Sequence, residues 1–570
     1  MTDQRNLLLA IVLSIAILLG FQLLYEAPRM EQRQAQLAQQ QAQTEQTVTV
    51  PPGATAPEGT RDRARLIAEQ HAAGQRVRID TPSLHGSVNL VGGRIDDLTL
   101  ASYHETPDPT SPEIVLLAPQ GSPNAYFAEF GWVPEDRAVA APGPTTEWTV
   151  RGEATLTPDR PLTMTWDNGA GLEFERTISV DRDFMFTVVQ RVRNTGDTAV
   201  RLLPYGLASR HGTPRTEGFY ILHEGPLGVF DGKLLELDYS DLRDDRTITR
   251  HTTGGWIGIT DKYWLVSLVP DQSESATARF LYNRRGTEDR YQVDMMGEAV
   301  EVAPGATAED TTRLFAGAKQ VRLLDAYAEQ YGITNFDLAI DFGWFYFLTK
   351  PFFYALDVLA GLLGNFGLAI LAFTVIIKLI FFPLANKSYH AMARMKKLQP
   401  KMQELREKFE NDKPRMNQEL MALYKREKVN PMAGCLPILV QIPVFFALYK
   451  VLFVSIEMRH APFYGWIHDL AAPDPTSIFN LFGLIPWDPP ALLMLGAWPI
   501  IMGITMWLQQ KMNPAPPDPV QQKIFAFLPI VFTFMLASFP AGLVIYWAWN
   551  NLLSVAQQWV IMRQDGVKFT

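Results

Sequence analysis

The spacing of hydrophobic residues changes twice along the 570-residue chain. The segment Leu7–Tyr25 near the N-terminus is predominantly apolar. From about Arg76 to about Phe315, short runs alternate apolar with polar residues, which is typical of half-buried strands. Beyond residue 365 long apolar runs return, and their length predicts helices that span a bilayer. The pattern therefore predicts a composite membrane protein with one large β domain outside the bilayer.

The N-terminal region predicts an anchor followed by a linker. The apolar part of residues 1–25 is longer than the core of a signal peptide, and no small-residue cleavage pattern follows it, so we expect an uncleaved transmembrane anchor. Arg5 weakly favours a cytoplasmic N-terminus. Residues 26–75 are rich in Gln and then in Pro, Gly and Thr, with few large apolar residues. We therefore expect a flexible linker there.

Residues 76–323 predict an antiparallel β-sandwich, because many strand-like runs follow one another without helical periods. The clearest runs are Leu156–Trp166, Leu172–Val180, Phe184–Val192, Trp256–Val269, Ala276–Leu281 and Tyr291–Met296. The histidines of this domain are scattered, and no motif of a hydrolase, a zinc protease or a phosphate-binding loop accompanies them. We therefore expect no catalytic residues and no enzyme, while a sugar-binding cleft stays open as an alternative.

The C-terminal pattern predicts five further spans, hence six in all, with both chain ends in the cytoplasm. The expected divisions are connecting and interfacial helices at 324–364, transmembrane helix 2 at 365–385, a cytoplasmic helical hairpin at 386–430, transmembrane helix 3 at 431–456, a periplasmic loop at 457–490, transmembrane helices 4, 5 and 6 at 491–510, 523–539 and 541–562, and a cytoplasmic tail at 563–570.

Charge fixes the expected orientation. Residues 386–430 carry twelve basic and six acidic residues, although the whole chain has a net charge of -9. A basic loop between two spans should be cytoplasmic, which places the β domain on the outer side of the membrane. The basic side chains, among them Arg394, Lys396, Lys397 and Lys401, form either a solvated face of paired helices or a docking surface for anionic lipids, nascent chains or ribosomal RNA.

Composition excludes several kinds of chemistry. The acidic balance of the chain argues against a general nucleic-acid binder, so we expect no DNA partner. The single cysteine, Cys435, excludes an intrachain disulfide and a Cys-based zinc site. We expect neither a metal nor a cofactor.

Lys378 is the one charged residue in the apolar run Phe366–Ala385. A lysine inside a spanning helix costs about 2.5 to 3.5 kcal/mol on insertion scales. It either extends its stem to the headgroups or faces a water-filled pocket that opens to the cytoplasm. If the helix continues to Ala385, Lys378 lies roughly 10 Å below the helix end, whereas its stem recovers only roughly 6 Å. This depth favours the pocket.

Other polar residues occur at the same predicted depth, in the cytoplasmic halves of the spans. Amides in spanning helices often only hold helices together. Their shared depth instead favours a hydrophilic cavity closed towards the periplasm, and the absence of intramembrane carboxylates argues against ion-coupled transport. The candidate residues are Thr374, Lys378, Gln441, Asn550, Ser554 and Gln557.

The C-terminal 230 or so residues resemble the YidC/Oxa/Alb membrane insertase family. The matching segments are FFPLANKSYHAMARMKKLQPK, ALYKREKVNPMAGCLPILVQIPVFFALY, WIHDL, DPVQQKIFAFLPIVFTF and FPAGLVIYWAWNNLLSVAQQ. The resemblance extends over the β domain mainly by position and size. It implies a polytopic α-helical membrane protein with a five-helix insertase core, a hydrophilic groove and a periplasmic β-supersandwich. Lys378 stands where the family commonly has arginine, and Tyr546-Trp547 stands at an aromatic pair of the final helix.

The resemblance also implies the function. The chain is expected to insert and help fold nascent inner-membrane proteins, alone or with the Sec translocon, without nucleotide hydrolysis. The short C-terminal tail implies only a weak or transient ribosome contact, and the expected location is the bacterial inner membrane. Two alternatives are a small-solute transporter and a membrane-anchored periplasmic sugar-binding protein.

Overall fold

The computed structural model describes residues 62–216, 222–409, 412–427, 429, 436–485, 487, 489–490, 494–513 and 519–566. The expected N-terminal anchor and Cys435 lie outside these residues. The chain forms two compact units, one containing residues 398–429 and the other containing the β domain and the remaining described helices. We describe the two units separately.

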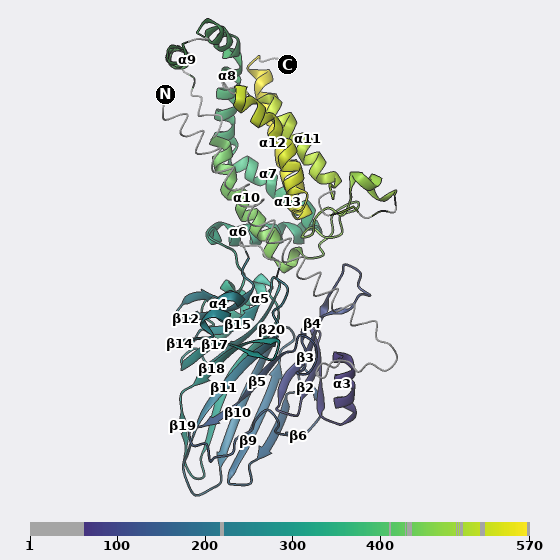
Figure 1. Cartoon of the computed structure of the whole chain (residues 1–570), viewed down its shortest axis with the longest axis vertical. Helices are drawn as coiled ribbons and strands as arrows, with labels where there is room; N and C mark the ends of the chain where they lie inside the picture. The colour runs from purple at the N-terminus through teal and green to yellow at the C-terminus, as the bar shows by residue number, and fades with distance from the viewer. Residues whose placement is uncertain are drawn as a thin grey trace. The chain divides into compact units, whose positions relative to one another are not determined.

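Two sheets form the β domain (Figure 1). The first sheet has the order β14-β17-β18-β11-β5-β3-β2-β1-β7, with β19 beside β11 and β4 beside β3, and the second has the order β13-β12-β15-β16-β20-β10-β9-β8-β6. The pairs are antiparallel except for β1 with β7. The strands are β1 (Arg76–Asp80), β2 (Leu84–Asn89), β3 (Arg94–His104), β4 (Glu113–Leu117), β5 (Tyr126–Pro134), β6 (Thr149–Arg151), β7 (Thr155–Leu156), β8 (Leu162–Asp167), β9 (Leu172–Val180), β10 (Met185–Asn194), β11 (Val200–His211), β12 (Gly225–Phe230), β13 (Lys233–Glu236), β14 (Thr247–Thr253), β15 (Trp256–Thr260), β16 (Trp264–Val269), β17 (Ser275–Arg285), β18 (Glu288–Gly297), β19 (Val300–Val302) and β20 (Thr307–Ala318).

The predicted β-sandwich is confirmed, and its core follows from the alternation of the sequence. In β9, every second side chain from Leu172 to Val180 is buried, because successive residues of a strand point to opposite faces. The long strand β10 lies between β9 and β20, with Phe186 opposite both Val180 and Leu314. Burial of such side chains from the two sheets supplies the main stabilisation of the domain.

Two predicted strands were wrong in their extent. The run Leu156–Trp166 contains β7 and β8 separated by a turn, and Trp256–Val269 contains β15 and β16, which pair with each other. Residues of β15 and of most of β16 are buried on both faces, so the sequence carries no alternation that would mark the turn between them. The domain also contains a short helix, α4 (Tyr239–Asp245).

The expected linker ends in an ordered helix, α3 (Arg63–Ala72), which corrects the prediction of a flexible segment to residue 75. Asp62 caps α3 by accepting a hydrogen bond from Arg65 N, and Leu66 is buried. The remaining helices are α5 (Val321–Tyr331), η2 (Phe336–Ala339), α6 (Tyr346–Leu363), α7 (Phe366–Ile380), α8 (Phe382–Lys408), α9 (Lys413–Arg426), α10 (Leu436–Val454), η4 (Ile456–Met458), η5 (Ile478–Gly483), α11 (Ala497–Met512), α12 (Pro519–Leu536) and α13 (Ala541–Gln564).

The predicted span 365–385 is bent rather than straight. Helix α7 ends at Ile380, and α8 leaves it at 70°. Pro383 explains the break, because proline lacks an N–H and its ring clashes with the carbonyl four residues earlier, whereas it fits the first turn of a new helix. Lys378 is thus two residues from the end of α7, so the depth argument above loses its geometric basis.

Length and apolar composition single out few membrane-crossing helices among the residues that the structure describes. Helix α6, which we expected to lie at the interface, is long and apolar enough to cross a bilayer, and the bent pair α7–α8 passes the same test as one unit. Parts of α10 and α12 are apolar but shorter. The number of spans stays a prediction.

The smaller unit contains the predicted helical hairpin. The end of α8 and helix α9 meet through Met402 and Tyr424, whose hydroxyl lies 3.8 Å from the Met402 sulfur. Asp412 begins α9 by accepting a hydrogen bond from Arg415 N, which agrees with the predicted restart after Asp412. Lys401 and Glu427 add an ion pair at 3.1 Å.

Candidate functional site

Lys378 and Ser554 join the first and last helices of the C-terminal core. The ammonium of Lys378 on α7 donates a hydrogen bond of 2.6 Å to the hydroxyl of Ser554 on α13. The same hydroxyl donates to the carbonyl of Asn550 at 2.8 Å, four residues earlier. Asn550 and Ser554 are both buried, so the predicted polar face of this helix is turned inward. The lysine charge is therefore held against α13 by a hydroxyl, not by a carboxylate.

Gln441 and Tyr546 make a second polar link, between α10 and α13. The side-chain amide of Gln441 donates to the hydroxyl of Tyr546, which is fully buried. Buried phenol and amide groups need such partners, because each unpaired group costs about 1 to 3 kcal/mol. Sequence alone indicated both residues, but not that they bind each other.

A small polar cavity lies beside these two links. Its volume is about 30 Å³, and its polar lining consists of Lys378, Tyr389 and Gln441, from α7, α8 and α10. Side chains such as Ile377 and Val440 complete the wall. A cavity of this volume has room for a water molecule, which needs on the order of 10 to 15 Å³ of accessible space and polar partners. Among the described residues, the site is thus a small, partly open pocket with three polar side chains in a mostly apolar wall.

Two of the predicted groove residues have other partners. The hydroxyl of Thr374 donates to the carbonyl of Ile370 in its own helix at 2.6 Å. Trp547 packs its ring against Phe445 and Phe532, with centroids 4.7 and 5.7 Å away. These contacts show a satisfied hydroxyl and an aromatic cluster.

Polar groups continue along the inner half of α13. Gln557 is half-buried, and its amide nitrogen is buried without a hydrogen-bond partner in the structure. Gln558 donates to Asn513 at 3.2 Å, and Asn551 donates to Thr505 at 3.4 Å. The two latter bonds connect α13 to α11 and its C-cap, as expected for amides that hold helices together.

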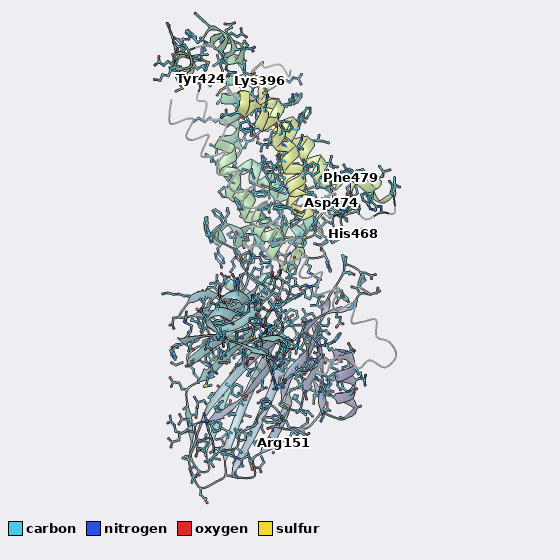
Figure 2. All side chains as sticks on the ribbon, viewed as in Figure 1. Arg151, Lys396, Tyr424, His468, Asp474 and Phe479 are labelled. Carbon is cyan, nitrogen blue, oxygen red and sulfur yellow. The ribbon has the colours of Figure 1, made fainter. Side chains whose placement is uncertain are left out.

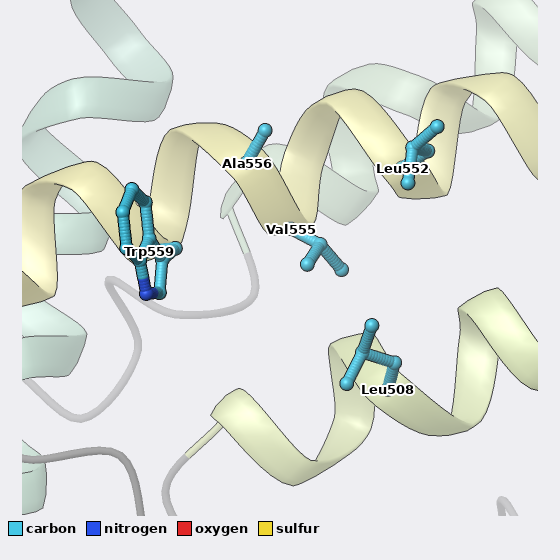
Figure 3. A pocket seen from close by; sticks show the side chains of 5 residues that line it. All are labelled: Leu508, Leu552, Val555, Ala556 and Trp559. Atoms are coloured by element: carbon cyan, nitrogen blue, oxygen red, sulfur yellow. The ribbon is translucent and has the colours of Figure 1, made fainter.

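A larger hollow of about 370 Å³ lies between α11 and α13 (Figure 3). Its lining is apolar: Leu508 from α11 faces Leu552, Val555, Ala556 and Trp559 from α13. Among its lining side chains, only Trp559 carries a polar atom, its indole nitrogen, and none is charged. We therefore place the candidate site at the small cavity that contains Lys378.

The predicted basic residues of α8 differ in exposure. Arg394, Lys397 and Lys401 are exposed, and their spacing of three and four residues places them on one helix face. Lys396, which is labelled in Figure 2, is half-buried, and burial lowers the pKa of its ammonium. Three of the four predicted residues thus form an exposed basic face of this helix.

Sequence reasoning missed Tyr389 and His390. Tyr389 reaches the cavity because α8 turns back at Pro383, a bend that a continuous span to Ala385 would not allow. His390 lies 2.8 Å from the carboxylate of Asp565 at the end of α13, so it fixes the start of α8 to the last helix. Pro383 was the signal in the sequence that could have predicted the position of Tyr389. No local pattern indicated the contact between His390 and Asp565.

Two family models match nearly the whole chain. The YidC periplasmic domain matches residues 76–355, and the 60Kd inner membrane protein model matches residues 358–567. The chain belongs to the YidC family. The match confirms the resemblance seen in the sequence, and with it the pairing of a periplasmic β-sandwich with a helical insertase core.

Curated relatives cover the chain from end to end. The membrane protein insertase YidC of Methylobacterium sp. (strain 4-46) is 54% identical over 99% of this chain and 96% of its own length. The YidC of Bradyrhizobium diazoefficiens is 51% identical over 100% of this chain and 97% of its own length. A solved structure titled as an active YidC insertase with its first transmembrane domain resolved is 17% identical, covers 85% of this chain and 92% of that chain, and gives a TM-score of 0.35.

Proposed function

We propose that this YidC-family chain inserts nascent inner-membrane proteins by offering them polar partners within the bilayer. These partners are Lys378 and Gln441, which line the small cavity, and Ser554 and Tyr546, to which they are hydrogen-bonded. The carrying observation is the bond between Lys378 and Ser554, which places a positive charge against the inward polar face of α13. Insertion itself involves no covalent chemistry, no cofactor and no nucleotide.

The pocket lowers the free-energy barrier that the polar tail of a substrate meets when it crosses the bilayer. A peptide group that enters hydrocarbon loses its hydrogen bonds to water, at several kcal/mol for each unsatisfied group. Donors and acceptors of α7, α10 and α13 replace part of that lost water. The hydrophobic segment of the substrate then moves sideways into lipid, and burial of its apolar surface supplies the driving force.

In the proposed arrangement both termini are cytoplasmic and the β domain is periplasmic. The excess of basic residues at 386–430 supports this orientation. Arg394, Lys397 and Lys401 on the exposed face of α8 would contact nascent chains, anionic lipid or, transiently, the ribosome. Cooperation with the Sec translocon is part of the proposal for longer substrates.

Substitution of Lys378 tests the proposal. Two unit charges about 4 Å apart attract by about 1 kcal/mol in water and about 4 kcal/mol at an effective dielectric constant of 20. We expect Lys378→Arg to retain insertion, Lys378→Gln to slow substrates with acidic tails by roughly tenfold, and Lys378→Glu to be worst because it repels them. The assay is insertion of short-tailed substrates into liposomes that contain only this protein.

Two comparisons make the result specific. Lys511→Gln removes the same charge from an exposed position on α11 and should insert normally. Substrates that differ only in having neutral tails should respond little to Lys378→Gln. Equal rates for both tails in the Gln variant would contradict the role of Lys378, and a matching loss in Lys511→Gln would indicate a general charge effect.

The sugar-binding alternative is tested by removing the β domain. We expect deletion of residues 80–308, with the helices folded, to leave insertion largely intact, because the polar pocket is built only from the C-terminal helices. The measurement is the same liposome assay, with helix content of the deleted protein checked by circular dichroism. Complete loss of insertion in a folded deletion would place an essential step in the β domain.

A further inference from the structure

The loop between α10 and α11, expected to be a periplasmic loop, displays apolar side chains at its tip. Phe479, Leu481, Phe482, Leu484, Ile485 and Trp487 are all exposed, and Leu484 reaches 83% exposure. No Asp, Glu, Lys or Arg occurs from Thr476 to Trp487. A patch of this size exposed to water is unusual in a folded protein and marks a surface that is covered in use.

The base of the loop is held by hydrogen bonds to one buried carboxylate. Asp474 is only 3% exposed, and one of its carboxylate oxygens accepts from Trp466 Nε1 at 3.1 Å and from the Thr476 hydroxyl at 2.7 Å. Its other oxygen accepts from Trp498 N at 2.9 Å in the first turn of α11. Gly496 leaves room for this contact, since a Cβ there would lie 2.6 Å from the carboxylate carbon of Asp474. The base thus ties the loop to the start of a membrane helix.

Part of the tip's backbone is paired within the loop, while the side chains are exposed. Phe482 N donates to Ser477 O at 2.7 Å, Ile485 N to Asn480 O at 3.0 Å, and Trp487 N to Ile485 O at 2.8 Å. Leu481 and Phe482 have φ values of 50° and 58°, a left-handed conformation that large side chains rarely adopt. Internal pairing of backbone groups is what a segment needs in order to enter a region without water.

The surface continues that of the membrane helices. The loop begins after α10 and ends at α11, whose Ile501, Ile504 and Trp507 are exposed apolar residues of the kind that face lipid. Figure 2 shows Asp474 and Phe479 on this loop where it extends sideways beside the helices. Aromatic residues at its edges, Tyr464 and Trp466, are exposed as well, and such rings favour the level of the lipid headgroups.

We propose that the exposed apolar side chains of Phe479–Ile485 and of Trp487 form a membrane-seated anchor, whose tip lies among the headgroups and upper acyl chains of the outer leaflet and not in the periplasmic water. Lipid fits better than a protein partner because the tip has no charged residue to set a register, whereas protein interfaces carry a polar rim. Seated in this way, the loop fixes the depth and tilt of the outer end of α11.

Site-specific fluorescence tests the anchor in the full chain. An environment-sensitive label is attached to Leu484→Cys, and separately to Phe479→Cys, in a Cys435→Ser background, and the protein is reconstituted in phosphatidylethanolamine–phosphatidylglycerol vesicles. Ile504→Cys on α11 serves as the lipid-facing reference, and Glu153→Cys, exposed in the β domain, serves as the aqueous reference. Each label is quenched by nitroxide lipids or by iodide added to the water.

The expected result is strong quenching by shallow nitroxide lipids together with iodide quenching several-fold weaker than at residue 153, for both tip positions. Iodide quenching equal to that at residue 153, with no lipid quenching, would place the tip in water and overturn the proposal. Protection from both quenchers would show that protein covers the tip, which also overturns it. In that case the measurement would be repeated at a lower ratio of protein to lipid. Protection that is lost on dilution would indicate a second copy of this chain, and protection that remains would indicate a cover from the same chain.

Discussion

Glu457 joins the β domain to the membrane helices and should make this junction sensitive to pH. Its Oε1 atom accepts a hydrogen bond of 2.9 Å from Val321 N, at the start of α5, while Oε2 is buried without a partner. Val321 follows the final strand of the sandwich, and Glu457 follows α10. Burial raises the pKa of this carboxyl to about 7, although backbone hydrogen bonds from Glu457 itself and from Val321 oppose the shift; smaller effects come from Asp357, which raises the pKa, and Arg322, which lowers it.

The raised pKa of Glu457 determines how the stability of the junction changes with pH. Because the folded protein holds the proton more tightly than the unfolded chain, the junction is most stable below the unfolded pKa of 4.5. Its stability falls as the pH rises from 4.5 to about 7, where the ionised carboxylate remains buried. A shift of this size corresponds to roughly 3 kcal/mol, since one pKa unit is about 1.4 kcal/mol.

Glu457→Gln is the matched perturbation. The amide keeps an oxygen that can accept from Val321 N but cannot ionise, so it should remove the penalty at high pH. We expect the variant to melt several degrees above the parent protein at pH 8 and close to it at pH 4.5. The measurement is tryptophan fluorescence of the full chain in lipid nanodiscs during heating, at pH values between 4.5 and 8.

The difference between the Glu457→Gln variant and the parent protein separates the effect of this carboxyl from that of other carboxyl groups. Asp310, whose pKa burial raises to about 6, contributes a slope of the same sign, but that slope is present in both proteins and cancels in their difference. Glu153→Gln, at an exposed position, should change nothing. An unchanged pH slope in Glu457→Gln, or a variant less stable than the parent at pH 8, would refute the reasoning.

Two further predictions concern packing. Cysteines at Met402 and Tyr424 in a Cys435→Ser background should be joined readily by a flexible bismaleimide, because the two native side chains meet with the hydroxyl and sulfur 3.8 Å apart, and cysteines at exposed Gln403 and Tyr424 should react more slowly; equal yields on denaturing gels would contradict the pairing of the two helices. Gly503→Val should lower the stability by about 1 to 3 kcal/mol in nanodisc melting, since a Cβ there would lie 2.1 Å from the hydroxyl oxygen of Thr533, while Gly361→Ala in open space should melt as the parent does.

Strand and helix periodicity predicted the architecture well where one face of an element is buried. Residues of β9 alternate strictly, and the stripe of the hairpin reappears in buried Met402 and Leu420. Periodicity did not predict the elements correctly where apolar residues occupy both faces of a strand or lie in a loop. The run from residue 491 to 510 resembles a span throughout, yet α11 begins only at Ala497, because hydropathy alone does not separate a helix from an apolar loop held by Asp474.

The sequence named some of the polar residues around the small cavity but not their contacts, and the role of these residues stays a prediction. Lys378 and Ser554 could be named because charge and hydroxyl are rare in apolar runs. Their bond across 176 positions depends on how α7 and α13 pack, which no local pattern encodes. Thr374 shows the opposite case, since its hydroxyl is satisfied by its own helix, a common solution for threonine in spanning helices.

The bend at Pro383 changes why Lys378 matters. With α7 ending at Ile380, a free lysine stem could reach past the helix end, so depth alone no longer requires a polar pocket. The ammonium instead turns inward to Ser554, and the neighbouring amide of Gln441 is bound to Tyr546. Both links are made between helices within the protein, so in the proposed mechanism a substrate group would replace one of them. A hydroxyl is a weaker partner for an ammonium than a carboxylate is, which makes the exchange favourable for an acidic tail. In the proposed mechanism, the contact with Ser554 therefore holds the lysine charge at a position where a substrate carboxylate would displace the serine hydroxyl.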